Sequence, residues 1–208
     1  DGVYTCKGII IASGSLPRKL NIPGEAELLS KGVFYCATCD GPLSAGKPVV
    51  VAGAGDSGIT ESIYLEQLGC KVTVVEFMEK PKASKVLLDR VEDNPNIEII
   101  CNAKIEAIVG DEWVKGVDIE NRSTGEKTRL DVSGIYIRIG LLPNTGFLKN
   151  TLKLTQVGQI PVNESMATEI PGIYAAGDVR EFSPAQMATA VGDGVTSAIA
   201  LGRYITSL

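Results

Sequence analysis

The sequence predicts an α/β fold built around a Rossmann-like, three-layer dinucleotide-binding domain with a β-meander insert. Two observations carry this prediction. An apolar run over 47–52 leads directly into the glycine-rich segment 53–58, and residues with helical apolar spacing follow, which is the order of a βαβ nucleotide-binding unit. Between 103 and 130 the pattern changes to short runs separated by turn residues, which indicates an antiparallel meander.

The elements before and within the βαβ unit follow from apolar runs and their breaks. Residues 7–12 are typical of a buried strand, and an irregular link begins at 16–18. A strand over 47–52 precedes a predicted helix over 57–68. A strand over 71–75 completes the unit.

The next elements are a helix over 83–92 and a short strand over 97–101. The meander strands are expected at 105–109, 113–119 and 126–130.

A buried strand is predicted over 132–139, and glycine and proline break regular structure over 140–145. After a short β-like piece at 159–162, a strand over 173–178 ends in an acid. A long helix of small residues is predicted over roughly 185–205.

Composition and charge exclude several classes of function. The 208 residues are 44% hydrophobic with a net charge of -5, and the basic residues are scattered, so neither nucleic acid nor a membrane is an expected partner. We expect a cytoplasmic protein, because the apolar runs are too short to span a bilayer and no signal-peptide pattern is present. The lack of histidine excludes Ser-His-Asp and Cys-His hydrolases and His-ligated zinc.

The glycine-rich segment carries a dinucleotide-binding signature. Gly53 gives the tight turn, Gly55 lets the backbone approach a pyrophosphate, and Gly58 lets helix and strand pack closely. Asp56 and Ser57 lie between them, where the helix N-terminus faces the phosphates. A merely tight turn is the alternative, but the strand before and the helix after favour nucleotide binding.

Glu76 ends the second strand of the βαβ unit, at the position where a ribose is recognised. A carboxylate accepts a hydrogen bond from the ribose 2′-hydroxyl and repels a 2′-phosphate, and no arginine follows immediately. NADH is therefore expected to be preferred over NADPH. A solvated acid at a strand end is the alternative.

Cys36 and Cys39 form a Cys-X-X-Cys pair, and Asp40 follows it. Such a pair can close a small disulfide ring and exchange electrons with other disulfides, with the acid carrying protons. The alternatives are half of a zinc site or two inert thiols and, for Asp40, a helix N-cap. No metal site is expected. The remaining cysteines are isolated and are expected to be core residues: Cys6, Cys70 and Cys101.

Together these residues resemble the low-molecular-weight thioredoxin reductase family, which includes the flavoprotein subunit of alkyl hydroperoxide reductase. The resemblance covers almost the whole chain. The motifs that carry it are Ala12-Ser13-Gly14, Cys36-Ala37-Thr38-Cys39-Asp40-Gly41, Gly53-Ala54-Gly55-Asp56-Ser57-Gly58, Ile139-Gly140-Leu141-Leu142-Pro143-Asn144-Thr145 and Gly172-Ile173-Tyr174-Ala175-Ala176-Gly177-Asp178.

The resemblance implies that electrons pass from a reduced nicotinamide to FAD, then to the cysteine pair, then to a thioredoxin- or glutaredoxin-like protein. Cys39 would face the flavin, Cys36 would attack the partner disulfide, and Asp40 would supply a proton. Asp178 would hydrogen-bond FAD. Ala185, Gln186 and Met187 would lie where the last helix presents its N-terminal amides to the flavin. Further implied cofactor-binding positions are Gly14, Gly140 and Gly177.

The resemblance also implies a division into domains. Residues 1–19 would be a remnant of the FAD-binding domain, 20–140 the NAD(P)-binding domain with the cysteine pair, and 141–208 the C-terminal part of the FAD-binding domain. The family begins with a further strand and glycine-rich loop for the ADP moiety of FAD, so the chain resembles an N-terminally truncated member. We expect these residues alone to lose FAD or bind it weakly, and the full-length protein to be a homodimer.

Two other functions stay open at this point. One is a peroxiredoxin-reducing flavoprotein subunit. The other is a non-catalytic NAD(H)-binding module that senses redox state through Cys36 and Cys39. A disulfide-reduction assay with NADH separates this module from an enzyme.

Overall fold

A computed structural model describes residues 2–208. The chain divides into a central unit, Pro17–Gly140, and an outer unit that joins the residues before Pro17 to Leu141–Leu208. Where the chain passes between them, strands β2 (Ser15–Pro17) and β11 (Leu141–Pro143) pair with each other. Among the described residues, no helix is long and apolar enough to cross a membrane.

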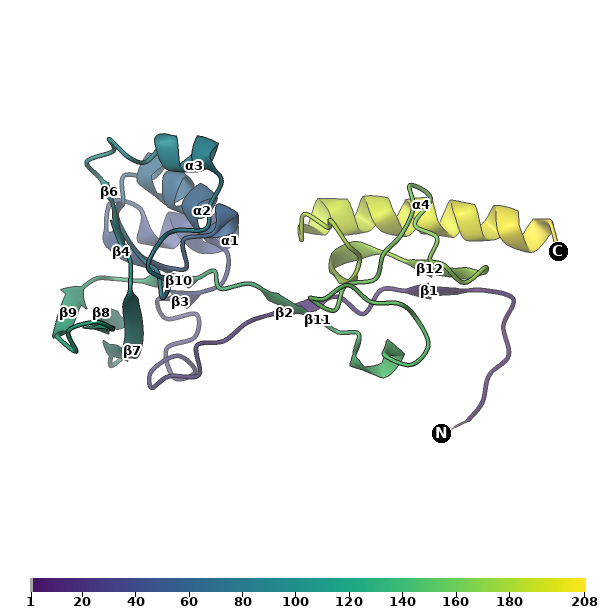
Figure 1. Ribbon diagram of the computed structural model, residues 1–208, viewed down its shortest axis with the longest axis horizontal. Helices are drawn as coiled ribbons and strands as arrows, with labels where there is room; N and C mark the ends of the chain where they lie inside the picture. Colours follow the sequence, from purple (N-terminus) through teal and green to yellow (C-terminus); the bar gives the residue numbers. More distant parts are fainter. Residues whose placement is uncertain (1) are drawn as a thin grey trace. The chain divides into compact units, whose positions relative to one another are not determined.

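The central unit is built on a parallel five-stranded sheet (Figure 1). In spatial order its strands are β3 (Val33–Phe34), β10 (Ile135–Ile137), β4 (Pro48–Ala52), β5 (Lys71–Val75) and β6 (Ile97–Ile100). Side chains of β4 alternate between two cores, and every one from Val49 to Ala52 is buried. A sheet buried on both faces gives the continuous apolar run seen in the sequence.

Helices cover one face of this sheet. They are α1 (Ala37–Asp40), α2 (Asp56–Gln67) and α3 (Lys85–Asp89). Ile59 and Leu65 of α2 pack in the same buried cluster as Val51 of β4. Gly69, at φ +80°, follows the end of α2, as expected of a residue that stops a helix.

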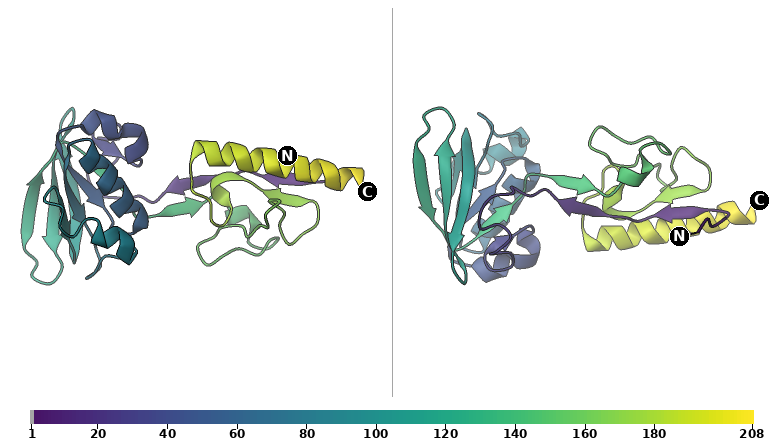
Figure 2. Two further views of the ribbon diagram at one scale, coloured as in Figure 1. Left: turned by 90° about the horizontal axis from the view of Figure 1, so that it is seen from above. Right: turned by 90° about the horizontal axis from the view of Figure 1, so that it is seen from below.

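An antiparallel meander covers the other face, and Figure 2 shows it opposite the helices. Its strands are β7 (Ala103–Gly110), β8 (Val114–Asn121) and β9 (Lys127–Asp131). Ile105, Val117 and Ile119 form one buried cluster with Val50 and Ile135 of the sheet. The predicted α/β, three-layer fold with a β-meander insert is therefore confirmed.

The outer unit contains the parallel pair β1 (Ile9–Ile11) and β12 (Ile173–Ala175), with the long helix α4 (Met187–Thr206) beside it (Figures 1 and 2). Two 3-10 turns, η2 (Gly146–Leu148) and η3 (Gly177–Val179), complete its regular elements, and η1 (Gly41–Ser44) follows α1 in the central unit. A small core gathers residues far apart in sequence: Ile11, Leu148, Leu152, Ile160, Ala175 and Val179.

Several predicted elements differ in extent or were missed. The helix predicted over 83–92 is confined to α3, and α4 begins two residues after Ala185, whose φ of +53° is not helical. The irregular link at 16–18 and the break at 140–145 contain β2 and β11, and 159–162 holds an isolated bridge from Ile160 to Arg180. Strands of two or three residues are too short for a side-chain period to reveal them.

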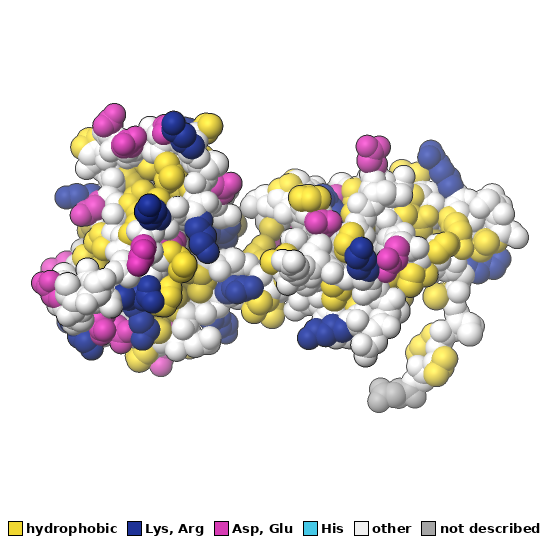
Figure 3. All heavy atoms as spheres, viewed as in Figure 1, with side chains coloured by type: hydrophobic (Ala, Val, Ile, Leu, Met, Phe, Trp, Pro, Cys, Tyr) yellow, Lys and Arg dark blue, Asp and Glu magenta, His cyan; other side chains and the backbone are white. Residues whose placement is uncertain are grey.

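Acidic and basic side chains are mixed on the face drawn in Figure 3. This mixture agrees with the scattered basic residues of the sequence. The assignment of 1–19, 20–140 and 141–208 to particular nucleotide-binding domains stays a prediction.

Candidate functional site

The cysteine pair lies where β3 leads into α1. Cys36 and Cys39 form a disulfide, and their Cα atoms are 5.4 Å apart. Cys36 is the N-cap of α1 in extended conformation, and its Sγ accepts the Cys39 N–H at 3.2 Å. Cys39 is exposed and Cys36 half-buried, so an external thiol can approach the disulfide.

Asp40 is the last residue of α1 rather than its N-cap, which is Cys36. It also precedes η1, but its side chain makes no capping hydrogen bond there. The alternative role as an N-cap after the pair therefore holds by position, at the start of η1, but without a side-chain hydrogen bond. The carboxylate is half-buried, and its role as a proton carrier stays a prediction.

The buried Glu61 and the half-buried Arg138 hold the backbone on either side of Cys36. The Ala37 N–H donates to Glu61 Oε2 at 3.1 Å, and Arg138 Nη1 donates to the Tyr35 carbonyl at 2.8 Å. Arg138 Nε lies 3.2 Å from Glu61 Oε1, an ion-pair distance without hydrogen-bond alignment. Burial raises the pKa of Glu61, and the Arg138 charge and the Ala37 N–H oppose that rise.

Neither of these two charged residues was predicted from the sequence. Glu61 lies on the buried stripe of α2 between Gly58 and Leu65, where a helix packed on a sheet normally carries apolar residues. A charge on that stripe is the signal that could have found it. Arg138 follows a buried strand, and nothing in its spacing predicts contact with Tyr35.

The glycine-rich loop connects β4 to α2 with the geometry that its glycines predict. Gly53 has φ +101°, and a Cβ there would lie 2.7 Å from the Arg138 carbonyl oxygen. A Cβ at Gly58 would clash with the Gly53 carbonyl oxygen. Gly55 is the N-cap of α2, and among the described residues no heavy atom lies within 4 Å of a Cβ placed on it. The backbone at Gly55 is therefore open to a ligand.

A cleft of about 760 Å³ opens beside this loop, at the carboxyl ends of β4 and β5. Ligands of parallel α/β sheets bind at this edge. Six of the predicted cofactor-binding residues line it: Gly53, Gly55, Asp56, Ser57, Glu76 and Gly140. Gly58 does not line the cleft but packs closely against the Gly53 carbonyl. The Asp56 carboxylate also accepts the Ser84 N–H at 2.6 Å, so it helps to hold the cleft wall.

Glu76 lines this cleft and is 8% exposed. Its Oε2 accepts the Ala54 N–H at 2.7 Å, and its Oε1 accepts the Met78 N–H at 2.9 Å. The alternative of a solvated acid at a strand end is therefore wrong. Each carboxylate oxygen keeps acceptor capacity beyond its one backbone partner.

A second pocket, of about 550 Å³, involves a residue that was not predicted from the sequence. Arg122, from the turn after β8, stacks on the Phe77 ring at 3.7 Å from its centroid and donates to the Phe77 carbonyl at 2.9 Å. Both residues line this pocket together with Lys80 and Lys82. Arg122 is 46 positions after Glu76 in the chain, so its proximity to this segment could not be read from local spacing.

The predicted flavin residues lie in the outer unit. Gly177 and the half-buried Asp178 belong to η3, and Ser15 Oγ donates to the Asp178 carbonyl at 2.8 Å. Gly14, at φ +68°, precedes β2, and its carbonyl accepts the Asn144 N–H at 2.9 Å. The turn at Gly177 requires φ +77°, a conformation that favours glycine.

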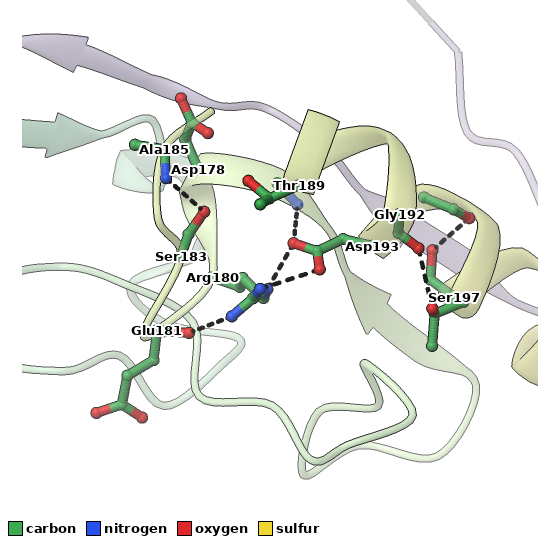
Figure 4. Close-up of polar contacts among 12 residues, drawn as sticks. Asp178, Arg180, Glu181, Ser183, Ala185, Thr189, Gly192, Asp193 and Ser197 are labelled. Carbon is green, nitrogen blue, oxygen red and sulfur yellow. Dashed lines mark hydrogen bonds and ion pairs between the residues drawn. The ribbon is translucent and has the colours of Figure 1, made fainter. Parts of the chain in front are cut away.

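An ion pair between the half-buried Arg180 and the buried Asp193 fixes this turn to α4 (Figure 4). Arg180 Nε and Nη2 donate to the Asp193 carboxylate at 2.6 and 3.0 Å, and the Gly177 N–H donates to the same carboxylate at 3.1 Å. Figure 4 shows the Asp178 carboxylate pointing away from this pair. Neither Arg180 nor Asp193 was predicted from the sequence, since they are 13 residues apart on different elements.

The start of α4 differs in one respect from the prediction. Gln186 is its N-cap and Met187 its first residue, whereas Ala185 lies outside the helix. Thr189 Oγ1 donates to the Gln186 carbonyl at 2.8 Å and closes the first turn. Met187 is 85% exposed.

The remaining cysteines differ from one another in environment. Cys70 is buried, as predicted, and its Sγ donates to the Ser44 carbonyl at 3.1 Å. Burial raises the pKa of the Cys70 thiol and of the partly buried Cys101 thiol. Cys6 is exposed, so its expected core position is wrong. Among the described residues, no group of three or more His, Cys, Asp or Glu side chains is placed to hold a metal ion.

Comparison with known proteins agrees with this arrangement. The chain is 40% identical over 99% of its length to an alkyl hydroperoxide reductase component of Staphylococcus epidermidis, and 43% identical over 98% to the corresponding protein of Staphylococcus aureus. It spans 40% of the length of these relatives.

Solved structures of thioredoxin reductases have the same fold. That of Streptococcus pyogenes matches 97% of this chain and 66% of its own, with a TM-score of 0.84 and 39% identity. The enzyme of Giardia duodenalis matches 96% of this chain and 66% of its own, with a TM-score of 0.88 and 34% identity. The resemblance to these proteins is confirmed. Residues 1–194 match the family model described as pyridine nucleotide-disulphide oxidoreductase, and the chain therefore belongs to that family.

Proposed function

We propose that the full-length protein is a flavoprotein disulfide oxidoreductase of the thioredoxin reductase type. FAD, when bound, relays electrons from a reduced nicotinamide to the Cys36–Cys39 disulfide, and the resulting dithiol reduces a thioredoxin- or glutaredoxin-like protein. The observation that carries this proposal is an accessible disulfide in the same compact unit as a glycine-loop cleft.

The central cleft fits a pyridine nucleotide. Its volume of about 760 Å³ lies in the range of ligand pockets, and Gly55 leaves room for a pyrophosphate at the start of the twelve-residue helix α2. Glu76 would accept a hydrogen bond from the adenine ribose. Because its carboxylate repels a 2′-phosphate, we propose that NADH is preferred over NADPH.

The dithiol would act by thiol–disulfide exchange. The Cys36 thiolate attacks one sulfur of the partner disulfide, forms a mixed disulfide and releases the other partner sulfur as a thiolate. The Cys39 thiolate then attacks Cys36 Sγ, which re-forms the internal disulfide and releases the reduced partner. Asp40 would supply the proton that a departing thiolate takes up. Cys39 is the sulfur assigned to face the flavin.

The outer unit offers part of a flavin site. Gly14, Gly177 and Asp178 form turns that end strands β1 and β12, and the Arg180–Asp193 pair holds one of these turns against α4. Gln186 and Met187 at the start of α4 would face the flavin, with Ala185 just before them. We propose that these 208 residues bind FAD weakly or not at all by themselves, and that the full-length protein is a cytoplasmic homodimer.

A second function is favoured by one specific observation. The chain is 40–43% identical to components of alkyl hydroperoxide reductase. The partner of the dithiol would then belong to a peroxiredoxin-reducing system.

The test is an anaerobic titration of the full-length, FAD-loaded protein with NADH and, separately, with NADPH, followed by flavin absorbance. We expect rapid bleaching with NADH and slow bleaching with NADPH. Addition of oxidised thioredoxin or oxidised peroxiredoxin should then restore the absorbance and identify the partner. Failure of both nucleotides to bleach the flavin would overturn the proposed function and favour a non-catalytic redox-sensing module.

A further inference from the structure

The backbone around Cys36 is held on both sides by side chains from outside its own segment. The residue before it, Tyr35, has its carbonyl bound by Arg138 at 2.8 Å, and the residue after it, Ala37, donates its N–H to Glu61 at 3.1 Å. Glu61 belongs to α2, and Arg138 follows β10. Because these contacts bracket Cys36, the position of its sulfur depends on them.

Simple packing does not explain a carboxylate at position 61. The Glu61 side chain is 11% exposed and lies on the buried stripe of α2, where an apolar residue would avoid the cost of desolvating a charge. Its two carboxylate oxygens are directed at Ala37 and Arg138. The charge is therefore used beside the cysteine pair rather than for the stability of α2.

This charge acts on the two redox states differently. Opening the disulfide takes two electrons and two protons and gives two thiols, one of which loses its proton when a thiolate forms. A carboxylate bound to the N–H next to Cys36 opposes a negative charge there and leaves the neutral disulfide unaffected. The charged or titratable groups that face Glu61 are Arg138, Asp40 and Tyr136.

We propose that Glu61, with Arg138 as its counter-charge, is a positioning residue that sets the redox equilibrium of the Cys36–Cys39 pair. The inference rests on the proposed function and deepens it. Glu61 fixes the Cys36 backbone in the conformation of the disulfide, and its charge disfavours the Cys36 thiolate. Both effects stabilise the oxidised form against the reduced form.

The test compares two variants of the full-length protein, Glu61→Gln and Glu66→Gln. Both remove one negative charge from α2, but Glu66 is bound by the exposed Asn96 amide instead of by the cysteine segment. Each protein is equilibrated in glutathione buffers without nucleotide, thiols are trapped by alkylation, and the peptide that carries Cys36 and Cys39 is quantified by mass spectrometry.

We expect Glu61→Gln to shift the equilibrium toward the dithiol by about tenfold at neutral pH, which is about 30 mV for a two-electron couple. The break in the pH dependence of the equilibrium, which marks thiolate formation, should move to lower pH. Glu66→Gln should stay within about twofold of the parent protein. If Glu61→Gln and Glu66→Gln had the same equilibrium constant with glutathione and the same pH dependence of that constant, the proposal would be overturned.

A second pair of variants covers the case in which Glu61→Gln does not fold. Arg138→Lys keeps the positive charge, but a lysine ammonium cannot replace the guanidinium fork that reaches both Glu61 and Tyr35. We expect Arg138→Lys to shift the equilibrium toward the dithiol by less than Glu61→Gln does. Arg129→Lys, at the exposed pair with Asp118, is the control. No shift in Arg138→Lys relative to Arg129→Lys would contradict the proposal.

The glutathione equilibrium involves no nucleotide and no flavin reduction. A protein that NADH fails to reduce can still show the Glu61 effect. Conversely, a fully active reductase whose equilibrium ignores Glu61 would overturn this inference and leave the proposed function intact.

Discussion

At the scale of single residues, Glu76 links the glycine-rich loop to the segment after β5, because its two oxygens accept backbone N–H groups from both. The same carboxylate lines the cleft. Its charge, rather than its shape, is what we expect to discriminate between the two nicotinamide nucleotides.

The variant Glu76→Gln tests this expectation. Loss of the charge removes repulsion of a 2′-phosphate, so the ratio of kcat/KM for NADH to that for NADPH should fall by about tenfold, equivalent to about 1.4 kcal/mol. Glu98→Gln, on the exposed side of β6, is the matched control and should leave the ratio unchanged. If the ratio is unchanged in Glu76→Gln, Glu76 only binds the backbone of the loop and does not discriminate between the nucleotides.

The contrast between Cys70 and Cys6 gives a second prediction at this scale. Cys70 is 1% exposed, donates to the Ser44 carbonyl and has a thiol pKa raised by burial, whereas Cys6 is exposed. Because the thiolate is the reactive form, iodoacetamide should label Cys6 in the native protein and label Cys70 after unfolding. Peptide mass spectrometry measures both, and equally fast native labelling would contradict the buried position of Cys70.

At the scale of elements, the ion pair between Arg180 and Asp193 joins the turn η3 to α4. The two side chains are 14% and 8% exposed, and the pair also receives the Gly177 N–H. Removal of one member leaves the other charge buried without its partner. This geometry makes the position of Asp178 depend on the helix.

We expect Asp193→Asn to destabilise the outer unit by about 3 kcal/mol, the usual cost of breaking a buried pair. Hydrogen exchange of α4 amides in the full-length protein is the measurement, and exchange should accelerate along the helix. The control is Asp118→Asn, which breaks the more exposed pair with Arg129 and should cost less than about 1 kcal/mol. Unchanged protection of α4 in Asp193→Asn would rule out this role of the pair.

At the scale of the whole molecule, Glu61 makes the stability of the folded chain depend on pH. Burial raises the pKa of Glu61 above its ordinary 4.5. A carboxyl with a raised folded pKa binds its proton more tightly in the folded state. Its contribution to stability is therefore complete below the unfolded pKa and is lost as pH rises through the folded value.

Urea denaturation of the parent protein and of Glu61→Gln across this pH range measures the effect. The free energy of unfolding of the parent should fall relative to that of the variant as pH rises from below 4.5. Glu66→Gln serves as the reference for a change of net charge. A pH-independent difference between Glu61→Gln and the parent would contradict the raised pKa.

Local features of the whole molecule could be predicted from the sequence, whereas contacts formed by tertiary packing could not. The apolar runs of 47–52 and 71–75 and the glycines between them predicted the buried sheet and the loop, because these signals are local and periodic. Strand β3 has only two residues, which is too few to show an alternation of apolar and polar side chains. Glu61 with Arg138, and Arg180 with Asp193, become partners through tertiary packing, which spacing along the chain does not encode.

Strand β4 has a consequence for how the chain finds its fold. Its side chains from Val49 to Ala52 are all apolar and buried, on both faces of the sheet. A shift of the strand register by one residue would move each of them into the opposite core without burying a polar group. Hydrophobicity alone therefore cannot correct such a misalignment. Gly53 fixes the register instead. Its φ of +101° and its close approach to the Arg138 carbonyl exclude the residues on either side of it from this position. The glycine beside the cleft therefore also sets the register of β4 during folding.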